Sequence, residues 1–136
     1  MVKKIVLLSI LALLGCQESA KNSPINKMGQ DSTVTFMSEH LTMTVPKQMN
    51  AETLFPVSLH FSQPVRDVKA KLISINMDMG TMPIIFSAQE NGHLQDYHSQ
   101  VIVGSCTEPS MEWRMLITWL QGEQRMQHSQ IIEIKR

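Results

Sequence analysis

The sequence lacks most of the features that mark the well-characterised classes of protein. Its 136 residues include only two cysteines and 5% aromatic residues, and its formal net charge is zero. It has no His-x-His, Cys-x-x-Cys or His-Glu-x-x-His motif, which argues against the usual kinds of zinc site. It has no phosphate loop, no dinucleotide fingerprint and no basic stripe, so neither nucleotide nor nucleic-acid binding is indicated.

The longest apolar run stands near the N-terminus. Lys3 and Lys4 precede ten largely apolar residues, 5–14. A membrane-spanning helix needs about 20 such residues, whereas the hydrophobic region of a secretory signal has about 7–15. The run ends Leu13-Leu14-Gly15-Cys16, which resembles the lipobox of bacterial lipoproteins, a family in which the cysteine is acylated and becomes the first mature residue. We therefore expect a lipoprotein signal peptide at 1–15 and lipidation of Cys16. An ordinary signal peptide is the alternative, with the same exported destination.

Lipidation would place the protein in the bacterial cell envelope, anchored to a membrane and facing the periplasm. Gln17 follows the cysteine where aspartate would be a retention signal, and the sorting rule of enterobacterial lipoproteins then favours the outer membrane. Loss of Lys3 and Lys4 leaves ten basic against twelve acidic residues, a formal charge of −2. The polar residues 16–32 have little to bury, and we expect them to be a flexible tether.

The remainder, 33–136, consists of short apolar-alternating runs separated by turn residues, with no long helical period. The clearest strand is Phe55–Phe61. We expect further strands at Ile84-Ile85-Phe86, Trp113–Trp119 and Met126–Ile134, and Asn91-Gly92 is a strong hairpin signal. About seven strands at this spacing predict a single all-β domain, an immunoglobulin-like antiparallel β-sandwich.

The order of these segments carries a family resemblance. "FPVSLHF", "PVRDVKAKL", "MDMGTMP", "NGHLQDYHSQVIV" and "MEWRMLITW" follow one another between about residues 55 and 119. This order resembles the small bacterial periplasmic sandwiches of the YtkA-like and FixH-like group. The resemblance implies a sandwich fold and a connection with copper handling or with assembly of respiratory oxidases. Here the turn is richer in methionine and poorer in glycine than is usual in that group.

Three thioethers lie close together in the segment Asn76-Met-Asp-Met-Gly-Thr-Met-Pro83. Thioethers and thiolates are soft ligands that select Cu(I) over hard cations. Met77 and Met79 are two apart and share a face of an extended segment, and a bend at Gly80 can return Met82 toward that face. The spacing permits a Cu(I) site of these three residues without requiring it.

A second group of sulfur atoms follows in the connection that contains Cys106 and Met111. Cys106 is the only cysteine left if Cys16 is lipidated. Because an even number of strands separates this connection from the methionine turn, we expect both at one end of the sandwich, where interstrand loops cluster. Cys106 and Met111 are therefore further candidate ligands. A buried, inert Cys106 is the alternative.

Two other interpretations of the methionines stay open. Methionine fills irregular gaps in a core, and this chain has few aromatic residues to do so. Adaptable methionine surfaces also bind protein partners. The chain is then a metal-free envelope protein, either structural or docking a periplasmic partner with its methionine-rich end. No nucleophile, base and oxyanion arrangement accompanies Asp78 or Glu108, so we expect a non-enzyme with no catalytic residues.

Overall fold

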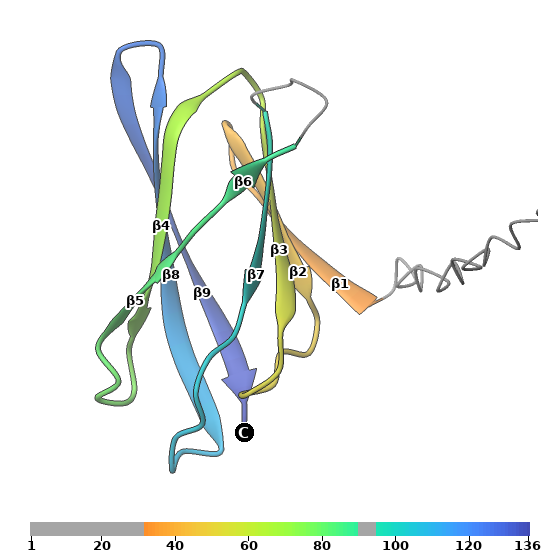
Figure 1. Cartoon of the computed structure of the whole chain (residues 1–136), viewed down its shortest axis with the longest axis vertical. Coiled ribbons are helices and arrows are strands. Elements are labelled where there is room, and N and C mark those ends of the chain that lie inside the picture. The colour runs from red at the N-terminus through yellow and green to blue at the C-terminus, as the bar shows by residue number, and fades with distance from the viewer. Residues whose placement is uncertain (1–31, 90–94) are drawn as a thin grey trace, which may run out of the picture.

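The computed structural model describes residues 32–89 and 95–136. Within these ranges the chain forms nine strands and no α-helix (Figure 1). The strands are β1 (Thr33–Met37), β2 (Leu41–Pro46), β3 (Phe55–Phe61), β4 (Arg66–Ser74), β5 (Thr81–Ile84), β6 (Ser87–Ala88), β7 (Asp96–Val101), β8 (Ser110–Gln121) and β9 (Gln124–Lys135).

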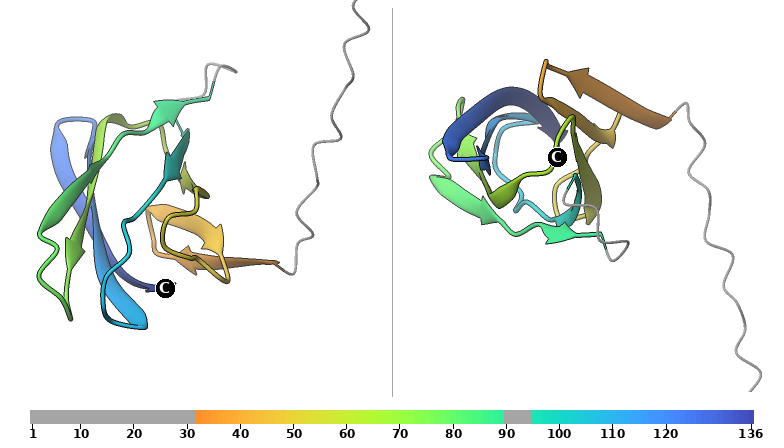
Figure 2. Two further views of the ribbon diagram at one scale, coloured as in Figure 1. Left: turned by 60° about the horizontal axis from the view of Figure 1, so that its bottom comes forward. Right: turned by 90° about the horizontal axis from the view of Figure 1, so that it is seen from above.

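These strands form two antiparallel sheets that face each other across the core (Figure 2). One sheet has the order β1-β2-β3-β7-β6, and the other has the order β5-β4-β8-β9. The prediction of an all-β antiparallel sandwich is therefore confirmed, with nine strands instead of about seven.

The core follows from the alternation that the sequence displays. In β3, Phe55, Val57, Leu59 and Phe61 are buried while Ser58 and His60 lie on the outer face. In β8 the inward positions are Met111, Trp113, Met115, Ile117 and Trp119, all at most 2% exposed. The ring of Phe61 contacts that of Trp119 with centroids 5.1 Å apart, which joins the two sheets.

The predicted strand Ile84-Ile85-Phe86 is wrong in detail. Ile84 ends β5 in one sheet, and the chain then crosses to the other sheet, where Ser87 and Ala88 pair with β7 (Figure 1). The hydroxyl of Ser99 donates to the carbonyl oxygen of Ile85 at 2.8 Å and fixes this crossing. Three consecutive apolar residues show no alternation, so the sequence did not indicate that the segment divides between two sheets.

Several expectations fall outside the described residues. These are the signal peptide at 1–15, the lipidation of Cys16, the tether up to residue 31, and the Asn91-Gly92 turn. Within the described ranges, no helix is long and apolar enough to cross a membrane.

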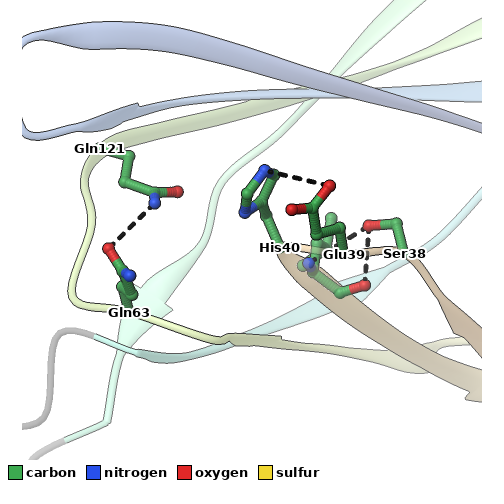
Figure 3. A network of polar contacts seen from close by, with 6 residues as sticks. Ser38, Glu39, His40, Gln63 and Gln121 are labelled. Atoms are coloured by element: carbon green, nitrogen blue, oxygen red, sulfur yellow. Dashed lines mark hydrogen bonds and ion pairs between the residues drawn. The ribbon is translucent and has the colours of Figure 1, made fainter.

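The two ends of the sandwich differ in chemistry. The end formed by the β1–β2, β3–β4 and β8–β9 turns carries the polar side chains of Ser38, Glu39, His40, Gln63 and Gln121 (Figure 3). The side-chain amide of Gln121 donates to Gln63 at 3.0 Å, and the Ser38 hydroxyl donates to the Leu41 carbonyl at 3.0 Å. The opposite end holds the β4–β5 and β7–β8 connections (Figure 1). These connections contain Met77, Met79 and Cys106.

Candidate metal centre

The register of the β4–β8 pair brings the methionine turn and the cysteine loop to one end of the sandwich. Ser74, the last residue of β4, pairs with Trp113, close to the start of β8. The 75–80 turn leaves β4 at this point, and the 102–109 loop enters β8 at the same end (Figure 1). The expected meeting of the two connections is therefore present in the fold.

The side chain of Asn76 fastens the turn to β8. Its amide nitrogen donates to the carbonyl oxygen of Ser110 at 2.9 Å, and its amide oxygen accepts from the backbone N–H of Glu112 at 2.9 Å. The N–H of Ile75 also donates to the Glu112 carbonyl at 3.0 Å. Asn76 thus acts as an additional peptide group of the sheet beside Met111, and it fixes where the turn begins.

The turn closes on itself through Ser74 and Gly80. The backbone N–H and the hydroxyl of Ser74 both donate to the carbonyl oxygen of Gly80, each at 3.1 Å. Gly80 has a φ of 73°, in the left-handed region that favours glycine. The sharp reversal between Met79 and Thr81 therefore depends on a glycine at this position.

The three methionines of the turn differ in exposure. Met77 and Met82 are half-buried and pack against the core, and Met82 pairs with Leu72 across the β4–β5 hairpin. Met79 is 37% exposed. A β-carbon placed on Gly104 would lie 3.7 Å from Met79 Cε, so the Met79 side chain reaches across to the cysteine loop.

Cys106 is half-buried and packs against the core cluster. Hydrogen bonding from the backbone of Glu108, together with the Thr107 hydroxyl 3.8 Å from Sγ, holds the pKa of the thiol below its ordinary value. The thiolate is the form that binds soft metals. The loop therefore increases the fraction of Cys106 that is thiolate at a given pH.

Met111 is fully buried, with its side chain among the inward residues of β8. Its position is explained by packing alone, as is that of Met115 on the same face.

Met49 was not singled out from the sequence, yet it lies at this end and is 6% exposed. Its carbonyl oxygen accepts from the N–H of Lys135 at 2.8 Å, and Lys135 pairs with Ser110, beside Met111. The N–H of Glu52 donates to Val103 at 2.7 Å, so this segment crosses the end of the sandwich. Residues 47–54 have no strand alternation, and their sequence offers no signal for this crossing.

Oxygen and nitrogen ligands do not gather here. Asp78 and Glu108 are exposed. His60 and His98 lie on the outer face of the other sheet, where His60 contacts Asp96 at 2.7 Å and His98 contacts Ser58 at 3.0 Å. Within the described ranges, no group of three or more His, Cys, Asp or Glu side chains could hold a metal ion. A metal at the methionine end would therefore be bound mainly through thioethers.

Comparisons with known proteins add little to this geometry. No family model matches the chain, and no curated protein matches it. One similar solved structure is titled "Crystal structure of Br derivative BhCBM56". It is 10% identical over 75% of this chain and 98% of that chain, with a TM-score of 0.47. So low a similarity supports no functional inference.

Proposed function

We propose that the protein is a lipid-anchored protein of the bacterial cell envelope whose methionine-rich end binds Cu(I), in copper handling or respiratory oxidase assembly. The observation that carries the proposal is the approach of Met79 to Gly104, two residues from Cys106. It means that a thioether of the 75–80 turn extends over the loop that holds the thiol. Cu(I) prefers such soft donors.

Within this proposal the residues have distinct roles. Met77, Met79 and Met82 are the thioether ligands, and Cys106 supplies a thiolate whose pKa is lowered mainly by hydrogen bonding from the Glu108 backbone. Met111 is a further candidate ligand from beneath the turn. The clamp by Asn76 holds the turn in place before the metal arrives, which reduces the ordering that binding would require.

X-ray absorption at the copper edge tests the ligand type directly. The sample is the full chain with Cys16→Ser, because this substitution removes the lipid and leaves Cys106 as the sole thiol. We expect sulfur scatterers at about 2.3 Å, as in other metal–sulfur sites. A first shell made only of nitrogen and oxygen would exclude the proposed ligands.

A second function is favoured by the exposed apolar atoms at this end. Ile75 is 40% exposed and Met79 is 37% exposed, and both lie in the turn. Flexible methionine surfaces adapt to protein partners, so this end could dock a periplasmic protein without any metal. Met79→Leu separates the two functions, because leucine keeps the apolar surface and removes the sulfur. If Met79→Leu loses Cu(I) binding, the metal function is favoured. If Met79→Leu still binds a protein partner and Met79→Asp does not, docking is favoured.

A further inference from the structure

A groove of about 510 Å³ lies on the outer face of the β5-β4-β8-β9 sheet, whereas Met82, beside Pro83 of its lining, packs against the core on the inner face. This volume is within the range of about 300–1,000 Å³ that is usual for small-molecule sites. Three neighbouring strands supply its walls, and the side chains around it are Lys69, Lys71, Pro83, Ile85, Leu116 and Thr118.

The groove lies where β5 ends. Pairing between β4 and β5 ends at Ala70 and Ile84, after which the chain turns away toward the other sheet. Ala70 and Ile84 face inward and form the floor of the groove between these strands. The crossing leaves Ile85 with 85% of its surface exposed, at the edge of the groove.

Apolar and cationic groups alternate across this face. Lys71 pairs with Pro83 on one side and with Leu116 on the other, and Lys69 pairs with Thr118. Two lysines line the groove and no acidic residue does. An occupant that complements it therefore needs an apolar body and a negative charge.

The two lysines are not equally available. Lys69 Nζ lies 2.8 Å from Asp67 Oδ1, and this salt bridge partly neutralises the charge of the Lys69 ammonium group. Lys71 is exposed and forms no salt bridge to any residue in 32–89 or 95–136. Lys71 is therefore the cation available for a ligand.

We propose that this groove binds an anionic amphiphile with a single alkyl chain, with its carboxylate at Lys71 and its chain along Pro83 and Ile85. The carboxylate gains a charge-assisted hydrogen bond, and the chain covers apolar surface that is otherwise in contact with water. The groove lies on a different face from the proposed copper ligands, so this site stands whether or not Cu(I) binds.

Isothermal titration with monomeric dodecanoate, below its critical micelle concentration, tests the proposal on the full Cys16→Ser chain. We expect saturable binding that weakens about fourfold for decanoate, because the chain loses two half-buried methylenes. Dodecyltrimethylammonium has the same chain and the opposite charge, and it should bind at least about tenfold more weakly than dodecanoate. Equal binding of the two amphiphiles would overturn the role of charge.

Matched variants locate the site. Ile85→Ser should weaken dodecanoate binding about fivefold and Lys71→Gln about threefold, because one removes apolar contact and the other removes an exposed charge. Ile131→Ser and Lys47→Gln are the controls, since both residues are exposed and lie outside the groove, and they should leave the affinity unchanged. If Ile85→Ser and Lys71→Gln behave like these controls, the proposal fails.

A bilayer is the other source of anionic alkyl chains. The same protein is mixed with vesicles of 1-palmitoyl-2-oleoyl-phosphatidylglycerol. Vesicle binding without binding of monomeric dodecanoate would overturn the proposal and would mean that this face rests on the bilayer surface. Dodecanoate binding that persists without vesicles, and that depends on Ile85 and Lys71, supports the groove.

Discussion

Met79 and Gly104 lie against each other at the methionine end of the sandwich, where a β-carbon on Gly104 would be 3.7 Å from Met79 Cε. The contact joins two connections that are 25 positions apart in the chain. It depends on the β4–β8 register, which places the end of one strand beside the start of the other. The closeness of the thioether turn to the thiol loop is therefore a property of the fold.

Alanine substitutions at Gly80 and Gly104 should differ in their effect on stability. Gly80→Ala should destabilise the protein by about 1 kcal/mol, because alanine strains at a φ of 73°. Gly104→Ala should be close to neutral, because the added carbon meets only Met79 Cε at an ordinary contact distance. Urea denaturation of both variants measures the difference. Equal losses would contradict the described geometry of the turn.

Asn76→Ala should loosen the turn without unfolding the sandwich. It removes two hydrogen bonds of 2.9 Å to Ser110 and Glu112, at an exposed site where water partly replaces them. We expect a loss of about 1 kcal/mol in the free energy of unfolding. Amide hydrogen exchange should speed up at Ile75, whose N–H bonds to Glu112. Unchanged exchange there would show that the side chain does not hold the turn.

Two substitutions of Met111 distinguish a role in core packing from a role in metal binding. Met111→Ala should cost about 2–5 kcal/mol because the side chain is fully buried, whereas Met111→Leu should cost less than about 1.5 kcal/mol. Thermal or chemical denaturation checks both values. If Met111→Leu also keeps the full affinity for Cu(I), Met111 is a core residue only, and the ligand set reduces to the turn and Cys106.

The pKa of Cys106 should respond to its two neighbours in opposite directions. The backbone of Glu108 lowers this pKa most, followed by the Thr107 hydroxyl, while the Glu108 carboxylate raises it. Thr107→Val should therefore raise the thiol pKa, and Glu108→Gln should lower it. Absorbance of the thiolate at 240 nm, followed against pH in the Cys16→Ser chain, gives the midpoints.

The same shift has a consequence for stability. A thiol whose pKa is lower in the folded than in the unfolded protein stabilises the fold above the ordinary pKa of 9.0. This contribution is lost as the pH falls through the lowered folded value. Stability that rises from neutral to alkaline pH in Cys16→Ser, compared with Cys16→Ser/Cys106→Ser, is the expected sign. The reverse slope would mean that the loop disfavours the thiolate.

Strand alternation predicted the elements whose two faces differ most. Phe55–Phe61 and Trp113–Trp119 have apolar residues at every second position, and in the structure these positions are the core. The common end of the two sulfur-containing connections was expected from an even strand count. Three strands in fact lie between them, and the expectation holds because β5 and β6 follow one another in a single traverse of the sandwich. Only the first of these predictions rests on the period of the strand.

Features set by tertiary contacts could not be predicted in this way. The division of 81–88 between two sheets depends on the Ser99 hydroxyl and the pairing of β6 with β7. The position of Met49 depends on backbone hydrogen bonds to Lys135, far away in the chain. The side chain of Asn76 holds the turn through the carbonyl of Ser110 and the N–H of Glu112. Nothing in the sequence distinguishes Asn76 from the short polar residues of other turns.

The central claim is tested most directly by anaerobic competition for Cu(I) between the full Cys16→Ser chain and a chromophoric chelator. We predict one Cu(I) bound per chain, with an affinity at least about tenfold weaker in Met79→Leu/Met82→Leu and in the Cys106→Ser derivative. Met37→Leu is the control, because Met37 is 79% exposed on β1, outside the proposed ligand set. Equal affinity in all of these proteins, or no Cu(I) binding at all, would contradict a copper site at the methionine end.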